Sequence, residues 1–334
     1  MLLFSDDERL LEKLSQLGNP LERLDKTVKW AMFLPILNRI FGNSEKDPSK
    51  GGRPPYNYLM MFKILLLARL YNLSDEAMEY QLLDRLSFRR FVGCDDERVP
   101  DAKTIWLYRE RLSKSGKEQK LFDCFSSMLE EEGLLAHKGQ IVDASFVEAP
   151  RQRNSRKENK QIKEGKVPED WDAPKRSQKD TDARWTKKGD QNHFGYKNHV
   201  CVDSKSKLIK NFQVTAANVH DSNVLAELCD THEPVFDDSA YVGKPVPEGC
   251  KHYTARRPYR NTPLTDVDKK FNRKLSRIRC RVEHVFGFIE NTMKGSTFRG
   301  IGFKRAKTNV TLTNLMYNIC RFEQIKRLNL NTWA

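Results

Sequence analysis

Residues 139–149 read GQIVDASFVEA, and at this point the chain changes from helical to strand-forming sequence. The β-branched residues of this stretch predict a strand with Asp143 in its middle. A second apolar run, PVFDDSAYVG at 234–243, leads into the adjacent acids Asp237 and Asp238. A carboxylate among apolar strand residues is costly to bury unless it is paired or binds a metal. These two strands therefore predict a site built on acids, although periodicity alone does not choose between Asp237 and Asp238.

Helical patterns fill the chain before residue 139. Apolar residues recur every three to four positions over 21–41, and GGRPPYNYLMMFKILLLARLYNL at 51–73 predicts a buried helix after a Gly/Pro breaker. Ser74 is the expected N-cap of a helix that ends at Gly93, and PDAKTIWLYRERL at 100–112 starts another helix. Such a helix pair is either a helix-turn-helix or plain helix packing. We predict a helical N-terminal region over 1–135 that binds DNA or mediates dimerisation.

The elements predicted after residue 139 define an α+β domain over 136–334. Residues 151–192 are polar, basic and poor in apolar residues, so a long flexible insertion is expected there. A hairpin over 196–217, a helix at 220–230, strands at 234–238 and 249–256 and helices at 269–294 and 311–328 follow. This order is that of a ribonuclease H-like domain, a mixed sheet with helices on both faces.

Charge and cysteine usage narrow the class of protein. The net charge is +14, and residues 251–307 contain sixteen Lys/Arg against four Asp/Glu. A basic excess in one window predicts a binding surface for a polyanion, and the alternative is a solvated face. The seven cysteines are scattered without a CxxC pair, which argues against a zinc ribbon or a disulfide framework and for a reducing compartment. No apolar run approaches the ~20 residues of a membrane span, and the acidic N-terminus is not that of a signal peptide.

A third acid lies in the long basic helix. Glu283 follows Val282 of the apolar stripe, and Arg279 lies one turn earlier on the same face, where it could orient or neutralise the carboxylate. Carboxylates without a His or Cys cluster suit Mg²⁺ or Mn²⁺, and two such ions can hydrolyse a phosphodiester. The alternative is that the strand acids are turn or cap residues and Glu283 belongs to a surface ion pair.

Several motifs together resemble bacterial DDE transposases of insertion sequences, most closely the insertion sequence five family. The resemblance covers most of the chain and rests on the segments at 51–93 and 100–112 and on IVDASFVEAP, DTDARWTKKGDQNHFGYKNHVCVD, TAANVHDSNV, DDSAYVG and RCRVEHVFGFIE. It implies that the catalytic and metal-binding residues are Asp143, Asp238 rather than Asp237, and Glu283, the last in an R-x-x-x-E motif that begins at Arg279.

This chain departs from the family pattern at two positions of the long helix. Ser276 stands where a tyrosine is common, and Glu290 stands where a lysine often follows the glutamate by seven residues. Lys294 is the candidate to replace that lysine. The residues expected to contact DNA are Trp185, Lys187, Lys188, Lys197, Arg256, Arg257, Arg260, Arg279, Lys294, Lys103, Arg109 and Arg111.

The resemblance implies a DNA transposase that binds the terminal inverted repeats of its element, cleaves with two Mg²⁺ or Mn²⁺ ions and joins 3′-OH ends to target DNA. It also implies a bacterial, cytoplasmic, nucleoid-associated protein that acts on double-stranded DNA as a homodimer or larger assembly. Two alternatives remain: a stand-alone structure-selective nuclease and a catalytically inactive DNA-binding remnant. The helical N-terminal region favours a transposase over a nuclease, and the intact acids argue against a remnant.

Overall fold

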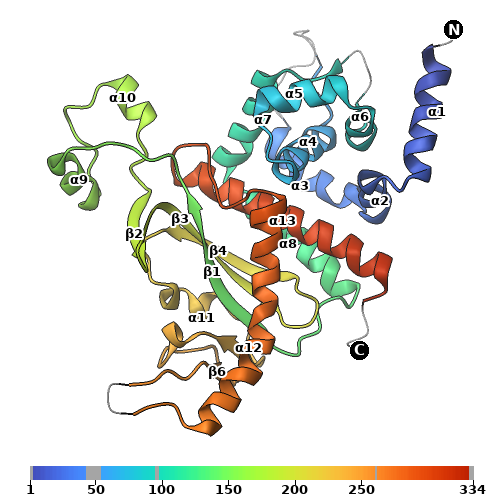
Figure 1. The fold of residues 1–334 in the computed structure, drawn as a ribbon. Helices are drawn as coiled ribbons and strands as arrows, with labels where there is room; N and C mark the ends of the chain where they lie inside the picture. Colours follow the sequence, from blue (N-terminus) through green and yellow to red (C-terminus); the bar gives the residue numbers. More distant parts are fainter. Residues whose placement is uncertain (1–2, 43–53, 95–97, 260–261, 331–334) are drawn as a thin grey trace. The chain divides into compact units, whose positions relative to one another are not determined.

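The computed structural model describes residues 3–42, 54–94, 98–259 and 262–330 and divides them between two compact units (Figure 1). One unit comprises the chain up to Leu134 together with the chain from Thr311 onward, and the other comprises Leu135–Val310. The sequence-based division assigned everything after residue 135 to a single domain. The structure differs because the C-terminal helix packs its second half into the N-terminal unit.

The N-terminal unit is helical. Asn57, Ser74 and Asp101 accept hydrogen bonds from the first-turn amides of α4, α5 and α7, so polar caps start these helices. The helix expected over 74–92 is broken at Arg85, which takes an extended conformation between α5 and α6. The helices are α1 (Leu3–Gln16), α2 (Pro20–Thr27), α3 (Leu34–Phe41), α4 (Tyr58–Leu70), α5 (Asp75–Asp84), α6 (Leu86–Val92), α7 (Ala102–Ser115) and α8 (Glu118–Glu131), with the larger part of α13 (Phe303–Leu328).

An aromatic cluster explains why α13 belongs mainly to this unit. The Phe33 ring lies 5.0 Å from that of Phe62 and 6.3 Å from that of Phe125, centroid to centroid. Phe322 of α13 meets Phe125 edge-on at 5.8 Å. Edge-on and offset ring pairs add to the free energy of apolar burial. The second half of α13 is therefore a core helix of the N-terminal unit.

The second unit is built on a mixed six-stranded sheet. Its order is β2-β3-β1-β5-β6, and β4 also pairs with β3. β1 runs antiparallel to β3 and parallel to β5, which in turn is parallel to β6. The expected hairpin is present as β3 and β4. The strands are β1 (Gln140–Glu148), β2 (Arg184–Lys188), β3 (Gln191–Asp203), β4 (Ile209–Ala216), β5 (Val235–Asp237) and β6 (His252–Thr254).

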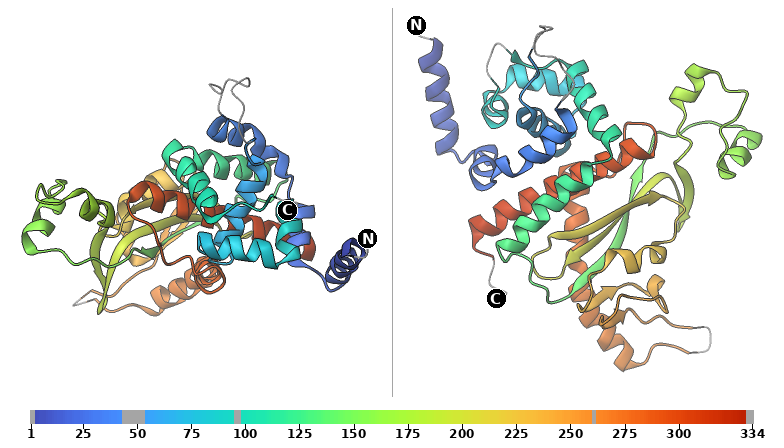
Figure 2. Two further views of the ribbon diagram at one scale, coloured as in Figure 1. Left: turned by 90° about the horizontal axis from the view of Figure 1, so that it is seen from above. Right: turned by 180° about the vertical axis from the view of Figure 1, so that it is seen from behind.

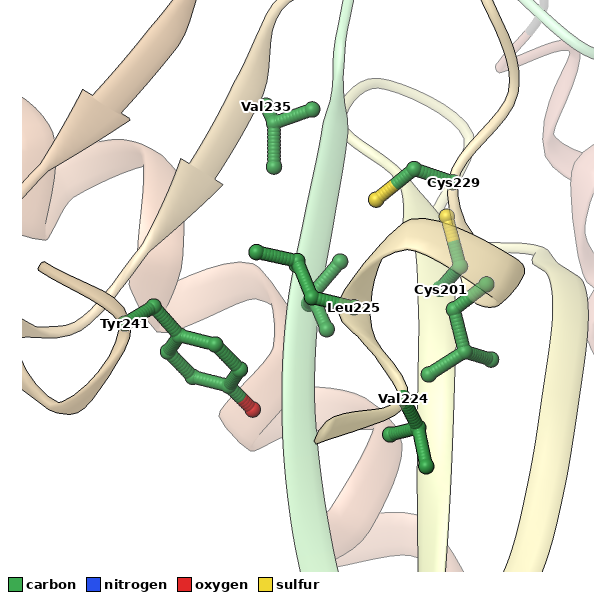
Figure 3. Close-up of a cluster of buried hydrophobic side chains, with 8 residues drawn as sticks. Cys201, Val224, Leu225, Cys229, Val235 and Tyr241 are labelled. Carbon is green, nitrogen blue, oxygen red and sulfur yellow. The ribbon is translucent and has the colours of Figure 1, made fainter. Parts of the chain in front are cut away.

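Helices cover both faces of this sheet. Val142 points to the face covered by the short helix α11 (Leu225–Leu228), where Leu225, Val235 and Tyr241 complete a buried cluster (Figure 3). Residue 143 points to the opposite face because side chains alternate along a strand. The long helix α12 (Asp266–Gly287) crosses that face and contacts β1 and β5 (Figure 1).

The segment 151–192 is folded, so the expectation of a structureless insertion is wrong for much of it. It contains α9 (Arg156–Lys163), α10 (Ala173–Gln178) and β2. We call residues 150–183 the arm; it extends from the sheet after β1 (Figure 2). Its centre is the carboxylate of Glu158, which accepts hydrogen bonds from the Ser155 amide at 2.6 Å, the Trp171 indole at 2.6 Å and the Lys175 ammonium at 2.8 Å.

Candidate active site

Strand register aligns Asp143 with Asp238. The parallel pairing of β1 with β5 sets Gln140 opposite Val235 and Ile141 opposite Phe236. Continued by two residues, the same register sets Asp143 opposite Asp238. The two side chains point to the α12 face, since Asp238 alternates with the buried Asp237. Two carboxylates from neighbouring strands therefore lie on the same face of the sheet, on adjacent positions of β1 and the end of β5.

Asp143 is short of compensating charge. Burial raises the pKa of its carboxyl to about 6, and the negative charge of Asp238 adds to the rise. The amide of Ala144, which donates to Asp143 Oδ1 at 2.8 Å, and the cations of Arg279 and Lys188 act in the opposite direction. Arg279 on α12 has its Nε buried without a hydrogen-bond partner among the described residues. The site thus holds a carboxyl group that a further cation would ionise.

Asp237 and Asp238 occupy different environments. Asp238 Oδ1 accepts the Ala240 amide at 2.7 Å and caps a 3₁₀ turn at Ser239–Tyr241. Asp237 is fully buried, and its Oδ2 lies 2.5 Å from Nε2 of His252 on β6. Burial raises the pKa of Asp237, and its Oδ1 has no hydrogen-bond partner in the described part of the chain. Only Asp238 is thus free to face Asp143.

Glu283 is not brought as close to Asp143 as Asp238 is. It is exposed on α12, one turn beyond Arg279. Within the described residues, no three His, Cys, Asp or Glu side chains lie close enough to hold a metal ion. Glu283 is therefore a candidate through its R-x-x-x-E motif, not through proximity. The helix ends soon after it, because α12 stops at Gly287 and a π-helical turn follows at Phe288–Thr292. Lys294 has a left-handed φ of 49° beyond that turn, so it is not on the Glu283 helix as expected.

The donor set fits a hard divalent cation. Asp143 and Asp238 supply carboxylate oxygens, which are the ligands that Mg²⁺ and Mn²⁺ prefer. Asp143 is half-buried beside the negative charge of Asp238, and both features raise the pKa of its carboxyl group. Both observations agree with cation binding by this pair of strands.

The basic and aromatic candidates on β2 are accessible. Trp185 is 47% exposed, and its ring lies 5.9 Å from the guanidinium of Arg151 and 5.0 Å from the ring of Phe194. Lys187 and Lys188 are exposed as well, and Lys188 is close enough to lower the pKa of Asp143. All three side chains are accessible to a ligand, and Lys188 is the one whose charge acts on Asp143.

Lys197 is buried and its ammonium group makes hydrogen bonds inside the protein, so its expected DNA contact stays a prediction that this environment does not favour. It is 9% exposed and donates to Asp221 Oδ1 and to the Val219 carbonyl, both at 2.8 Å. The fully buried His199 lies next to this pair, with Nε2 2.8 Å from the Thr215 hydroxyl. Burial lowers the pKa of His199 to about 4; the Asp221 charge opposes this shift and the Lys197 charge adds to it.

The arginines after β6 differ in what they contact. Arg256 forms an ion pair with Asp268, lies 4.7 Å from the ring of Phe271, and has its backbone bound on both sides by the Asn272 amide. Arg257 is exposed beside a cavity of about 470 Å³ that Arg256 also lines. The expected contact at Arg260 lies outside the described residues.

The candidate DNA contacts on α7 also differ in what their side chains contact. Arg109 donates two hydrogen bonds to Asp75 of α5, and Arg111 donates to the Phe41 carbonyl at 2.8 Å. Both arginines therefore join helices within the N-terminal unit. Arg111 is also exposed, and the expectation that the two residues contact DNA stays a prediction. Lys103 is exposed and remains a candidate DNA contact. The buried residues of α7 include Ile105 and Leu112, whereas Leu107 is 43% exposed.

Several polar groups near the site were not singled out from the sequence. His252 contacts Asp237, and the Tyr241 amide donates to the Asp238 carbonyl. No sequence signal distinguishes His252. Asp180 and Asp182 of the arm accept the amides of Gly302 and Phe303, respectively, at 2.9 Å. These bonds anchor the end of the arm to the start of α13.

A mixed sheet that carries paired acids, with exposed basic side chains on β2, is typical of a domain that processes nucleic acids. Comparison with known families agrees. Residues 135–319, more than half of the chain, match the family described as Transposase DDE domain. Residues 8–111 match the family described as Transposase domain (DUF772). The chain belongs to the DDE transposase domain family. No solved structure gives a significant match. Among the described helices, none is long and apolar enough to cross a membrane.

Proposed function

We propose that this transposase binds the terminal inverted repeats of its insertion sequence, cleaves the DNA hydrolytically and joins the freed 3′-OH ends to target DNA. The observation that carries the proposal is the pair of carboxylates on the adjacent strands β1 and β5, Asp143 and Asp238, with Arg279 beside them. The family membership supports transposition as the process. The motif resemblance supports the insertion sequence five family as the closest group.

Asp143, Asp238 and Glu283 would hold the divalent ions. When bound, two Mg²⁺ or Mn²⁺ ions supply activation of water and charge stabilisation at the phosphodiester. Arg279 limits the repulsion between the two strand carboxylates before an ion arrives, because its positive charge lowers the pKa of Asp143. Exposed Trp185 and Lys187 beside the site would hold the DNA strand, by stacking and by phosphate contact respectively.

The topology supports a ribonuclease H-like fold for the second unit. An antiparallel β4–β3–β1 portion continues into parallel β5 and β6, with helices on both faces. In this proposal the second unit performs the chemistry. The N-terminal unit contributes end recognition or subunit contact, because sequence is read from base edges and not from phosphates. Concerted cutting of two ends would be achieved most simply by a dimer or larger assembly on DNA.

A cleavage assay with DNA that carries the element's own ends separates the candidate functions. A transposase nicks at the ends in Mg²⁺ or Mn²⁺, loses this activity in EDTA, and spares matched DNA with scrambled ends. A structure-selective nuclease cuts branched DNA regardless of the end sequence. A catalytically inactive remnant binds the ends and cuts neither substrate. Cutting that ignores the end sequence, or the absence of all cutting, would contradict the proposal.

A further inference from the structure

Every exposed residue of helix α9 in the arm is basic. Two buried residues four positions apart, Glu158 and Ile162, form the inner side of the helix. Glu158 is the one acid of α9, so no acid shares the exposed side. Residues three and four positions apart lie on one side of a helix. The exposed residues are Lys157 and three residues that we call the α9 stripe, Arg156, Lys160 and Lys163.

The α9 stripe has no counter-charge in the described part of the chain. None of its three side chains forms an ion pair there, whereas Lys175 of the neighbouring helix α10 is paired with Glu158 at 2.8 Å. Like charges three or four positions apart destabilise a helix by about 0.2–0.5 kcal/mol per pair. The arm therefore bears a local cost that a bound polyanion would remove.

The base of the arm fixes the position of α9. Arg184 of β2 donates to the Ile162 carbonyl at 3.1 Å. Gln152 and Asp180, near the two ends of the arm, exchange two hydrogen bonds of 2.8 Å. The Asp180 carboxylate in turn accepts the Tyr196 hydroxyl of β3 at 2.8 Å. The α9 stripe is thus presented on a pre-organised element, which lowers the entropic cost of binding.

The length and chemistry of the α9 stripe fit a DNA backbone. The stripe spans about 10 Å of helix, and phosphates follow one another at about 3.4 Å along each DNA strand. It therefore has the length to meet about three phosphates. α9, which lies wholly within the described residues, exposes no apolar side chain for a membrane or an apolar protein groove. The arm also joins the strand of Asp143 to the strand of Trp185 and Lys187 (Figure 1).

We propose that the α9 stripe is a contact site for the DNA backbone that is separate from the strand carboxylates and reads no sequence. The inference rests on the proposed function, because it takes DNA as the polyanion. Lys and Arg bind phosphates through charge, and such contacts position a protein on DNA without reading its bases. The arm therefore contributes equally to the affinity for the element's ends and for unrelated DNA.

Salt-dependent DNA binding by the full-length protein tests the proposal. A neutral triple variant, Arg156→Gln with Lys160→Gln and Lys163→Gln, removes the charges and keeps residues that favour a helix. Its matched control, Arg156→Lys with Lys160→Arg and Lys163→Arg, keeps the three charges. Affinity is measured in EDTA for two duplexes of equal length, one with the element's ends and one with a scrambled sequence. The rate of chymotrypsin cleavage after the buried Trp171 shows whether the arm stays closed.

The expected change is a loss of salt dependence. Each phosphate contact contributes about 0.9 to the log–log salt slope. We expect the neutral triple variant to flatten this slope by about 2–3 units, equally on both duplexes. The single variants Lys160→Gln and Lys163→Gln should each flatten it by about one unit, and the charge-preserving control should keep the wild-type slope.

Three results would overturn the inference: an unchanged slope in the neutral triple variant, equal flattening in the charge-preserving control, or flattening on the end-bearing duplex alone. If the triple variant opens the arm, unchanged slopes in both single variants overturn it. The proposed function is tested separately. Its failure would appear as absent nicking by the wild type in Mg²⁺ and would leave the slopes measured in EDTA as they are.

Discussion

Replacing Glu158 by alanine should unfold the arm locally. Its carboxylate is the shared acceptor for Ser155, Trp171 and Lys175, and Trp171 is only 2% exposed. Hydrogen bonds to a charged group contribute about 1.5–3 kcal/mol each and are not additive, and a buried donor left unpaired costs about 1–3 kcal/mol. We therefore expect Glu158→Ala to lower the free energy of arm opening by about 3 kcal/mol.

Limited proteolysis measures the change in this free energy as a change in the rate at which the arm is cleaved. Each 1.4 kcal/mol corresponds to about a tenfold change in an equilibrium constant, so the open population should rise about 100-fold. Cleavage follows that population when the arm recloses faster than the protease cuts. Exposed lysines on α9, such as Lys157 and Lys160, offer trypsin sites. The measurement is the initial rate of trypsin cleavage within residues 151–183, with fragments identified by mass spectrometry.

Glu164→Ala is the matched control for this prediction. Glu164 is an exposed residue at the end of α9, and its ion pair with Lys166 spans 3.5 Å at the surface. Exposed ion pairs contribute little, so this variant should be cut at nearly the wild-type rate. Equal cleavage rates for Glu158→Ala and Glu164→Ala would show that the hydrogen bonds to Glu158 do not keep the arm closed. The hydrogen bonds also hold the pKa of Glu158 at about 2, below its ordinary 4.5. Their contribution is therefore complete above pH 4.5 and is lost as the pH falls toward 2.

Three further outcomes are expected. Arg109→Ala should destabilise the N-terminal unit by about 1–3 kcal/mol in urea unfolding, because Asp75 loses its hydrogen bonds, while Lys103→Ala should leave its stability unchanged. The wild type should lose stability as the pH falls from 6.5 to about 4, because the unfolded state binds the His199 proton more tightly. This loss should reach up to about 3 kcal/mol, and the His199→Asn variant should not show it. Parallel pH profiles of wild type and variant would contradict this. Arg257→Ala should flatten the log–log salt dependence of end binding by about one unit if it contacts a phosphate.

The sequence was sufficient to predict the elements that carry the acids. Apolar runs that end in or contain aspartate locate β1 and β5, and polar caps such as Ser74 locate helix starts. These features depend on neighbours within a few residues. Whether Asp143 faces Asp238 or Asp237 depends on strand register, which periodicity alone could not give; the choice of Asp238 came from the motif resemblance.

Features that depend on distant partners could not be predicted. The arm looks disordered by composition, yet Glu158 gathers donors up to seventeen positions away. Lys197 and Arg109 pair with Asp221 and Asp75, which are distant in the sequence and could not be anticipated as their partners. An apolar helix face predicts that α13 is buried but not which unit buries it. In each case the deciding interaction joins residues that sequence periodicity does not connect.

The central claim is that Asp143 and Asp238 support strand cleavage and not DNA binding. The most direct test measures end binding and end nicking separately, in Mg²⁺, for Asp143→Ala, Asp238→Ala and Glu283→Ala, with Asp237→Asn for comparison. We expect Asp143→Ala, Asp238→Ala and Glu283→Ala to bind the ends nearly as well as the wild type and to show no nicking. Wild-type nicking by Asp238→Ala, with loss of nicking in a folded Asp237→Asn protein, would contradict it.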